Sequence, residues 1–281
     1  MTTLFPSLQS LDLAKRVVTL DLQSSQDFDV VNRLKDIANP ITSQFHAISS
    51  AVKQLASVRP TFFLSSRVEA NKLKELNYLN VTTIQVQVPE GMSSVMSAYQ
   101  TQLLLAAHEY HDIIKDHLTP FLHFLEDMVT NKTSVSSVTQ YSGLLKTMSV
   151  KREKFNISFG KCFAAGSFET TRTFGEVYNS KADYLGAVDQ TEALNTWLGK
   201  VKTIEVQKLV TRICEVLDTL VDKVNKEEFT DISKTNLRYL ADCAFEVGRE
   251  VEFYALLVYR IQAVSSSMNV NAERLAVAMN S

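Results

Sequence analysis

The sequence holds 281 residues, of which 45% are hydrophobic, so it is long enough to bury the core of one large domain or two small ones. It has only 8 glycines and 5 prolines, residues that sheets and irregular folds need at turns and that helix interiors exclude. The 29 basic and 31 acidic residues give a net charge of −2 without a long run of either sign, which argues against nucleic-acid binding. Composition therefore favours a mainly α protein.

Two short segments in the N-terminal half alternate apolar and polar residues, as half-buried strands do. They are residues 18–23 and 83–88, and they are candidates to pair as a small two-stranded element, because an isolated edge would expose unpaired backbone groups. Between them, residues 27–55 carry an apolar stripe with helical spacing that is interrupted at Asn39-Pro40. Residues 65–80 predict a further short helix.

A long central helix is predicted from the serines at 93–97 to Met128. Apolar positions within it alternate in spacings of four and three, which keeps them on one face of a helix. These positions are Leu103, Ala107, Tyr110, Ile114, His117, Phe121, Phe124 and Met128. Pro120 falls inside the pattern and predicts a kink, since proline removes one backbone donor and crowds the preceding turn.

The rest of the chain alternates between weaker and stronger helical patterns. A helix is predicted from Val138 toward Phe159, and residues 160–190, which hold half of the glycines, are expected to be irregular. Two strong apolar seams follow, at 206–224 and 237–261. Asn271-Ala272-Glu273-Arg274-Leu275 predicts a last short helix.

These patterns predict a mainly α fold, an elongated multi-helix antiparallel bundle of long helices with a small two-stranded β-element near the N-terminal half. The chain divides into an N-terminal helical region at 1–130, a connecting region at 131–190 and a C-terminal long-helix hairpin at 191–281. The connecting region begins as a helix and continues as a glycine-containing irregular stretch.

The most specific chemical pattern is His108, His111 and Asp112, which stand at i, i+3 and i+4 on the central helix and could share one metal ion. The alternative is a solvated polar flank, because His108 and Asp112 lie roughly opposite the apolar stripe and His111 lies to one side. His117 falls on the stripe itself, which favours a buried core histidine over a general base or a pH switch.

Other chemistry-bearing residues have structural interpretations. Glu250 and Glu252 point in different directions on a helix, so we expect both to face solvent rather than to share a proton. Trp197 lies near an apolar seam and is expected in the core, with an interface role second. The three cysteines lack C-x-x-C spacing and predict thiols in a reducing compartment. Nucleotide-binding, hydrolase and metalloprotease motifs are not present, so we predict no catalytic, cofactor-binding or metal-binding residue and no cofactor.

We therefore expect a non-enzymatic structural or assembly protein that acts through helical surfaces. It would be one subunit of a larger oligomeric complex, such as a virus or phage particle, with copies of itself or other subunits as partners. One alternative is a curved helical dimer that binds membrane surfaces, which the near-neutral, interleaved charge disfavours. A second alternative is a metal-dependent enzyme using His108, His111 and Asp112.

The start of the chain, Met1 to Pro6, lacks a basic stretch followed by an apolar run, so we expect no signal peptide. The longest uninterrupted apolar run of the central helix, Leu103 to Ala107, is far too short to cross a bilayer. The expected location is the cytoplasm, or a virus particle assembled there.

Overall fold

The fold is given by a computed structural model, in which most of the described residues are helical. It describes residues 39, 41–43, 45–47, 49–50, 71–72, 74–75, 77–88, 92, 95–130, 132, 143–144, 146–147, 150–151, 153–155, 170–199, 201–226, 228 and 234–280. Long helices and a two-stranded antiparallel sheet confirm the fold class predicted from the sequence.

The chain divides into two compact units, each assembled from three stretches of sequence. The first unit comprises Met1–Gln54, His111–Lys154 and Ile204–Ala255, and the second comprises Leu55–Tyr110, Phe155–Thr203 and Leu256–Ser281. The units are therefore not consecutive in sequence, and the division at 130 and 190 stays a prediction.

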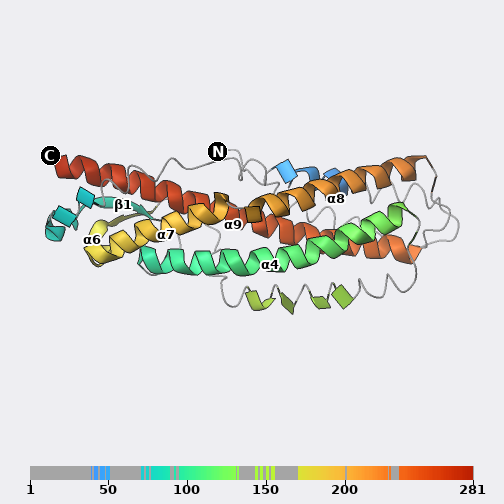
Figure 1. Ribbon diagram of the computed structural model, residues 1–281, viewed down its shortest axis with the longest axis horizontal. Helices are drawn as coiled ribbons and strands as arrows, with labels where there is room; N and C mark the ends of the chain where they lie inside the picture. Colours follow the sequence, from blue (N-terminus) through green and yellow to red (C-terminus); the bar gives the residue numbers. More distant parts are fainter. Residues whose placement is uncertain are drawn as a thin grey trace. The chain divides into compact units, whose positions relative to one another are not determined.

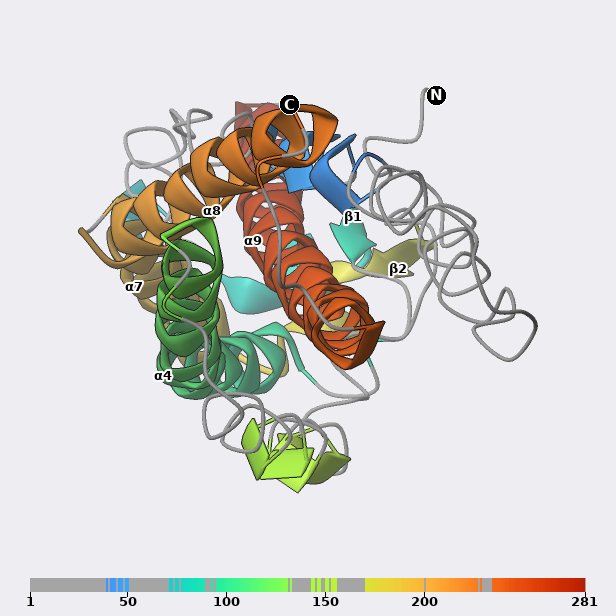
Figure 2. The same cartoon turned by 90° about the vertical axis from the view of Figure 1, so that its right-hand side faces the viewer.

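The first unit is built on parts of three long helices, α4 (Met96–Val129), α8 (Val201–Asn225) and α9 (Lys234–Asn280) (Figure 1). Lys115 Nζ donates to Glu205 Oε2 at 3.0 Å, and Lys223 Nζ donates to the carbonyl oxygen of Val129 at 2.7 Å. From residue 115 to residue 129 of α4, the contacting residue on α8 changes from 205 to 223, so α4 and α8 run in the same direction. Helix α9 runs antiparallel to them (Figure 1 and Figure 2), as the predicted bundle requires.

Burial in these helices follows the predicted stripes. All eight stripe positions of α4 are buried. The six apolar positions of the first C-terminal seam are buried as well, namely Val206, Val210, Ile213, Leu217, Leu220 and Val224. The second seam is buried at Leu240, Ala244, Val247, Val251, Tyr254, Val258 and Ile261. Phe45, from the predicted N-terminal helix, adds to this core, with its ring stacked on Phe121 at a centroid distance of 6.0 Å. The 3–4 spacing thus identifies the buried faces.

Two boundaries differ from the sequence prediction. Helix α9 continues through residues 271–275 to Asn280, so the last short helix is part of a single helix of 47 residues. Helix α7 (Lys181–Gly199) begins inside the stretch expected to be irregular. Pro120 lies inside α4, which continues to Val129, and the kink expected at Pro120 stays a prediction.

The second unit contains the sheet, which joins β1 (Gln85–Val88) to β2 (Thr170–Thr173). Val86 and Val88 are buried and alternate with less buried glutamines, as the period-two pattern predicts. Among the described residues, β1 pairs with β2 (Figure 2), and the two strands are antiparallel. Gln85 stands opposite Thr173 in this pairing. The other strand candidate, residues 18–23, lies outside the described residues.

Short helices on either side of the sheet build an aromatic cluster in the second unit. Helix η1 (Tyr78–Val81) precedes β1, and α6 (Phe174–Val177) follows β2. The ring of Phe174 lies 4.7 Å from that of Tyr178 and 5.4 Å from that of Tyr184, between ring centroids. The hydroxyl of Tyr178 contacts Met268 Sδ at 3.0 Å, and burial raises the pKa of this hydroxyl. The cluster therefore ties the sheet region to α7 and to the end of α9.

The start of α6 is fixed by close backbone contacts. Glu176 Oε2 accepts a hydrogen bond from the backbone N–H of Thr173 at 2.8 Å, and this bond lowers the pKa of the Glu176 carboxyl. The backbone N–H of Gly175 donates to the carbonyl oxygen of Thr82 at 2.9 Å. A Cβ atom at position 175 would lie 3.2 Å from Thr82 Cβ, so the approach favours glycine.

Candidate functional site

The three residues of the predicted metal pattern differ in their exposure to solvent. His108 is exposed beside Trp197, with a centroid distance of 6.5 Å, and Asp112 is exposed as well. His111 is only 2% exposed, so the expectation that it forms part of a solvated flank is wrong. Within the described residues, no group of three or more His, Cys, Asp or Glu side chains could hold a metal ion.

His111 is buried because two helices of the first unit cover it. Its Nε2 atom lies 4.0 Å from Glu205 Oε2 on α8, and its ring centroid lies 6.4 Å from that of Tyr254 on α9. Position 111 stands roughly 80° from the centre of the α4 stripe, at 100° per residue. A helix with neighbours on two sides buries a wider arc than its main stripe predicts.

Three other sequence interpretations can be compared with the structure. His117 and Trp197 are both buried, as predicted for core residues. Glu250, which we expected to face solvent, is 0% exposed, so that expectation is wrong. Glu250 lies one residue before the buried Val251, at the edge of the α9 seam, so the buried face of α9 is wider than the seam at this point.

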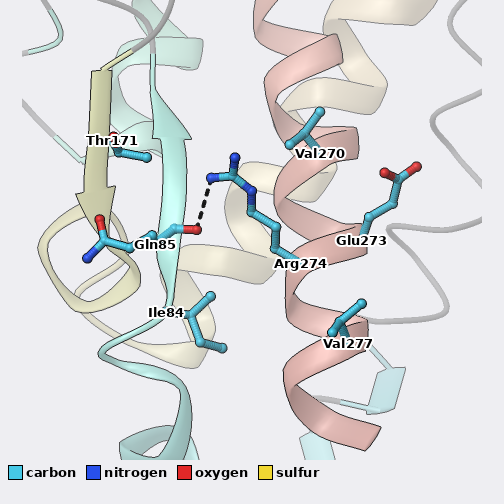
Figure 3. Close-up of a pocket in the computed structure, with 7 residues that line it drawn as sticks. All are labelled: Ile84, Gln85, Thr171, Val270, Glu273, Arg274 and Val277. Atoms are coloured by element: carbon cyan, nitrogen blue, oxygen red, sulfur yellow. Dashed lines mark hydrogen bonds between the residues drawn. The ribbon is translucent and has the colours of Figure 1, made fainter. Parts of the chain in front are cut away.

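The candidate interaction site is an open groove in the second unit, between β1 and the last turns of α9 (Figure 3). It has a volume of about 570 Å³. The residues that line it are Ile84, Gln85, Thr171, Val270, Glu273, Arg274 and Val277. Val277 is 72% exposed, so its aliphatic side chain is open to solvent within the chain.

Helix α9 closes the edge of β1 that faces away from β2. The backbone N–H of Phe174 donates to the carbonyl oxygen of Ile84, so alternation along the strand directs the backbone groups of Gln85 and Gln87 to the opposite edge. There, Asn271 Oδ1 accepts from the Gln87 N–H at 2.6 Å, and Asn271 Nδ2 donates to the Gln87 carbonyl oxygen at 2.8 Å. One side-chain amide thus replaces a neighbouring strand.

The two charged residues of the groove differ in direction. Figure 3 shows Arg274 extending from α9 toward β1, where one guanidinium nitrogen, Nη1, donates to the carbonyl oxygen of Gln85 at 3.2 Å. Glu273 points away from the strand in the same view, and Asn269 Nδ2 donates to its Oε1 at 3.4 Å. The positive charge therefore lies at β1, and the negative charge of the groove lies away from the strand.

Sequence reasoning missed this groove because the predicted α9 seam stopped at Ile261. Continuing the same spacing by four and three residues gives 265, 268, 272 and 275, all of which are buried. Asn271 is also buried, as a polar residue inside this apolar face, and that interruption is the available signal. The residue pair Asn271 and Arg274 stands one helical turn apart, which brings both side chains to one strand.

No protein-family model, curated protein sequence or solved structure matches this chain. Among the helices of the described residues, none combines the length and the apolar character needed to cross a membrane.

The hydrogen bonds of Asn271 make a direct prediction. Replacing Asn271 with alanine leaves both backbone groups of Gln87 without their side-chain partner, so we expect a loss of about 1–3 kcal/mol in the free energy of unfolding. Denaturant unfolding measures the loss, and amide hydrogen exchange at Gln87 should become faster. The control is Asn269→Ala, two residues earlier and on a more exposed part of α9, which should change stability by less than about 0.5 kcal/mol. Equal effects of the two substitutions would contradict the assigned role of Asn271.

Proposed function

We propose that this chain is a non-enzymatic structural or assembly protein, working through helical surfaces as one subunit of a larger oligomer or particle, such as that of a virus or phage. The observation that carries the proposal is the groove beside α9, where aliphatic side chains line a surface open to solvent. Exposed aliphatic side chains gathered beside a groove are typical of surfaces that contact other proteins.

Two features of the long helices support the same proposal. Their main apolar stripes are occupied by packing inside each unit, so contacts with other chains must use the remaining faces and the helix ends. Of the exposed aliphatic side chains on those faces, Leu105 on α4 and Ile204 on α8 do not line the groove, whereas Val277 on α9 does. Such residues are ordinary when isolated. Val277 is distinguished by its place in the groove.

The proposal predicts that Val277 contributes to association between subunits. Val277→Asp should lower the native mass of the purified protein, since a carboxylate would replace an aliphatic contact in the interface, with a cost of about 1–3 kcal/mol per contact. Helix content and melting temperature should stay nearly unchanged, because the side chain is 72% exposed within the chain. Light scattering after size-exclusion chromatography, over a range of concentrations, measures the mass.

Leu105→Asp provides a matched control, because Leu105 is also an exposed aliphatic residue but lies on α4 and does not line the groove. It should leave the native mass unchanged. A wild-type protein that stays monomeric at all concentrations, and that co-purifies with no other chain when isolated from its natural source, would refute the proposed function.

A further inference from the structure

We propose that Arg274 forms a carboxylate-binding position, and that the groove around it holds a segment of a neighbouring subunit in which a glutamate or aspartate is flanked by branched aliphatic side chains. This inference rests on the proposed function, because it assumes that the segment belongs to a subunit of the same assembly. It adds the chemistry of the partner, which the assembly proposal leaves open.

The charge of the groove supports this occupant. Within the part of the chain that the structure describes, Arg274 donates to the Gln85 carbonyl oxygen and has no acidic partner. A guanidinium carries five N–H donors, and a single bond to a carbonyl leaves four of them. Arginine binds a carboxylate through two parallel hydrogen bonds, in a geometry that lysine does not reproduce. Glu273 also lines the groove but points away from the strand, so the charge complement of the strand side is an anion (Figure 3).

The apolar lining defines what accompanies the carboxylate. Ile84 stands on the strand side, while Val270 and Val277 lie on α9 before and after Arg274. Positions 270, 274 and 277 follow the spacing of four and three, so they share one face of the helix. A carboxylate bound at the centre of this face is therefore flanked by aliphatic contacts. Aliphatic side chains next to the carboxylate would cover these contacts and exclude water from the ion pair.

The bond from Arg274 to Gln85 also has a purely structural explanation, since it covers the exposed edge of β1. The two roles differ in their need for charge. Covering a carbonyl oxygen requires one N–H donor, which a glutamine side chain also supplies, whereas pairing with a carboxylate requires the guanidinium. Arg274→Gln therefore separates them.

The test uses protein with ¹³C-labelled isoleucine and valine methyl groups and two blocked peptides, acetyl-Val-Glu-Val-amide and acetyl-Val-Gln-Val-amide. Neither peptide has a terminal charge, so they differ by one carboxylate. We expect the glutamate peptide to shift the methyl signals of Ile84 and Val277 saturably, and to bind about ten-fold more tightly than the glutamine peptide. Arg274→Gln should abolish this difference, while Lys208→Gln, which removes an exposed positive charge on α8 that does not line the groove, should preserve it.

Equal binding of the two peptides to the wild-type protein would overturn the inference, and so would the absence of methyl shifts at peptide concentrations up to about 10 mM, a weak affinity for ligands of this size. An undiminished preference in Arg274→Gln would overturn it as well. The native mass of the wild-type protein is measured separately. A protein that stays monomeric, co-purifies with no other chain and still prefers the glutamate peptide refutes the assembly proposal and keeps the carboxylate position. An oligomer without that preference keeps the assembly proposal and refutes the carboxylate position.

Discussion

Replacing Val251 with aspartate is expected to lower the free energy of unfolding by roughly 3–5 kcal/mol, because a carboxylate would enter the apolar core of the first unit. Val251 is fully buried in the middle of the α9 seam, and its seam neighbours Val247 and Tyr254 are buried as well. The new side chain would either ionise without adequate solvation or take up a proton, and both outcomes destabilise the fold. A loss of this size is a large share of the roughly 5–15 kcal/mol that stabilise a typical domain.

Thermal unfolding followed by circular dichroism at 222 nm measures the effect, and we expect the melting temperature to fall by about 10 °C. The matched control is Arg249→Ala, two residues earlier on the same helix. Arg249 is exposed, and its ion pair with Glu246, with Nη1 and Oε1 3.8 Å apart, is of the surface type that contributes about 0–1 kcal/mol. Similar melting temperatures for Val251→Asp and Arg249→Ala would show that the α9 seam does not pack in the core of the first unit.

The long helices could be predicted because one physical signal specifies them. A stripe repeated over many turns admits few other structures, and the stripes of α4, α8 and α9 are buried as predicted. The low content of glycine and proline agrees with the length of these helices. In these three helices, local pattern and tertiary packing point the same way.

Two sequence predictions were wrong because an apolar stripe does not show how wide the buried face of a helix is. His111 and Glu250 stand at the edges of their stripes, where burial depends on how many neighbours a helix has. Periodicity gives the direction of the buried face and leaves its width open. A helix with partners on two sides buries residues that a helix with one partner exposes.

The candidate site was harder to predict because it depends on contacts between distant segments. The strand partner of Gln85–Val88 is Thr170–Thr173, a short polar stretch that has no apolar alternation. Asn271 and Gln87 are separated by 184 residues, and no local pattern links a helical asparagine to a strand backbone. The hydrogen bond from Arg274 to the Gln85 carbonyl oxygen likewise joins residues that are distant in sequence, so the sequence alone does not predict it.

The largest effect in the second unit is expected from Phe174→Ala, which should lower the free energy of unfolding by about 3–5 kcal/mol. Phe174 is fully buried, and its ring contacts Tyr78 at 6.0 Å in addition to Tyr178 and Tyr184. Removing the ring leaves a cavity and ends three aromatic contacts, each of which contributes about 0.5–1.5 kcal/mol beyond its buried area. The backbone around position 174 cannot easily close the cavity, because the Phe174 N–H bonds to the Ile84 carbonyl oxygen and Gly175 lies against Thr82.

Two further variants serve as comparisons. One tests whether the aromatic ring of Phe174 matters beyond its volume, and the other is a control at an exposed residue. Phe174→Leu keeps most of the volume and should cost less than about 1.5 kcal/mol, whereas Leu79→Ala, at a residue that is 72% exposed, should change stability little. Denaturant unfolding gives the three stabilities, and near-ultraviolet circular dichroism reports the packing of the tyrosines. We expect the tyrosine signal of Phe174→Ala to weaken even under conditions in which the variant remains helical, because the neighbouring rings lose their fixed contacts. If Phe174→Ala instead unfolds like Leu79→Ala, the aromatic cluster does not form the core of this unit.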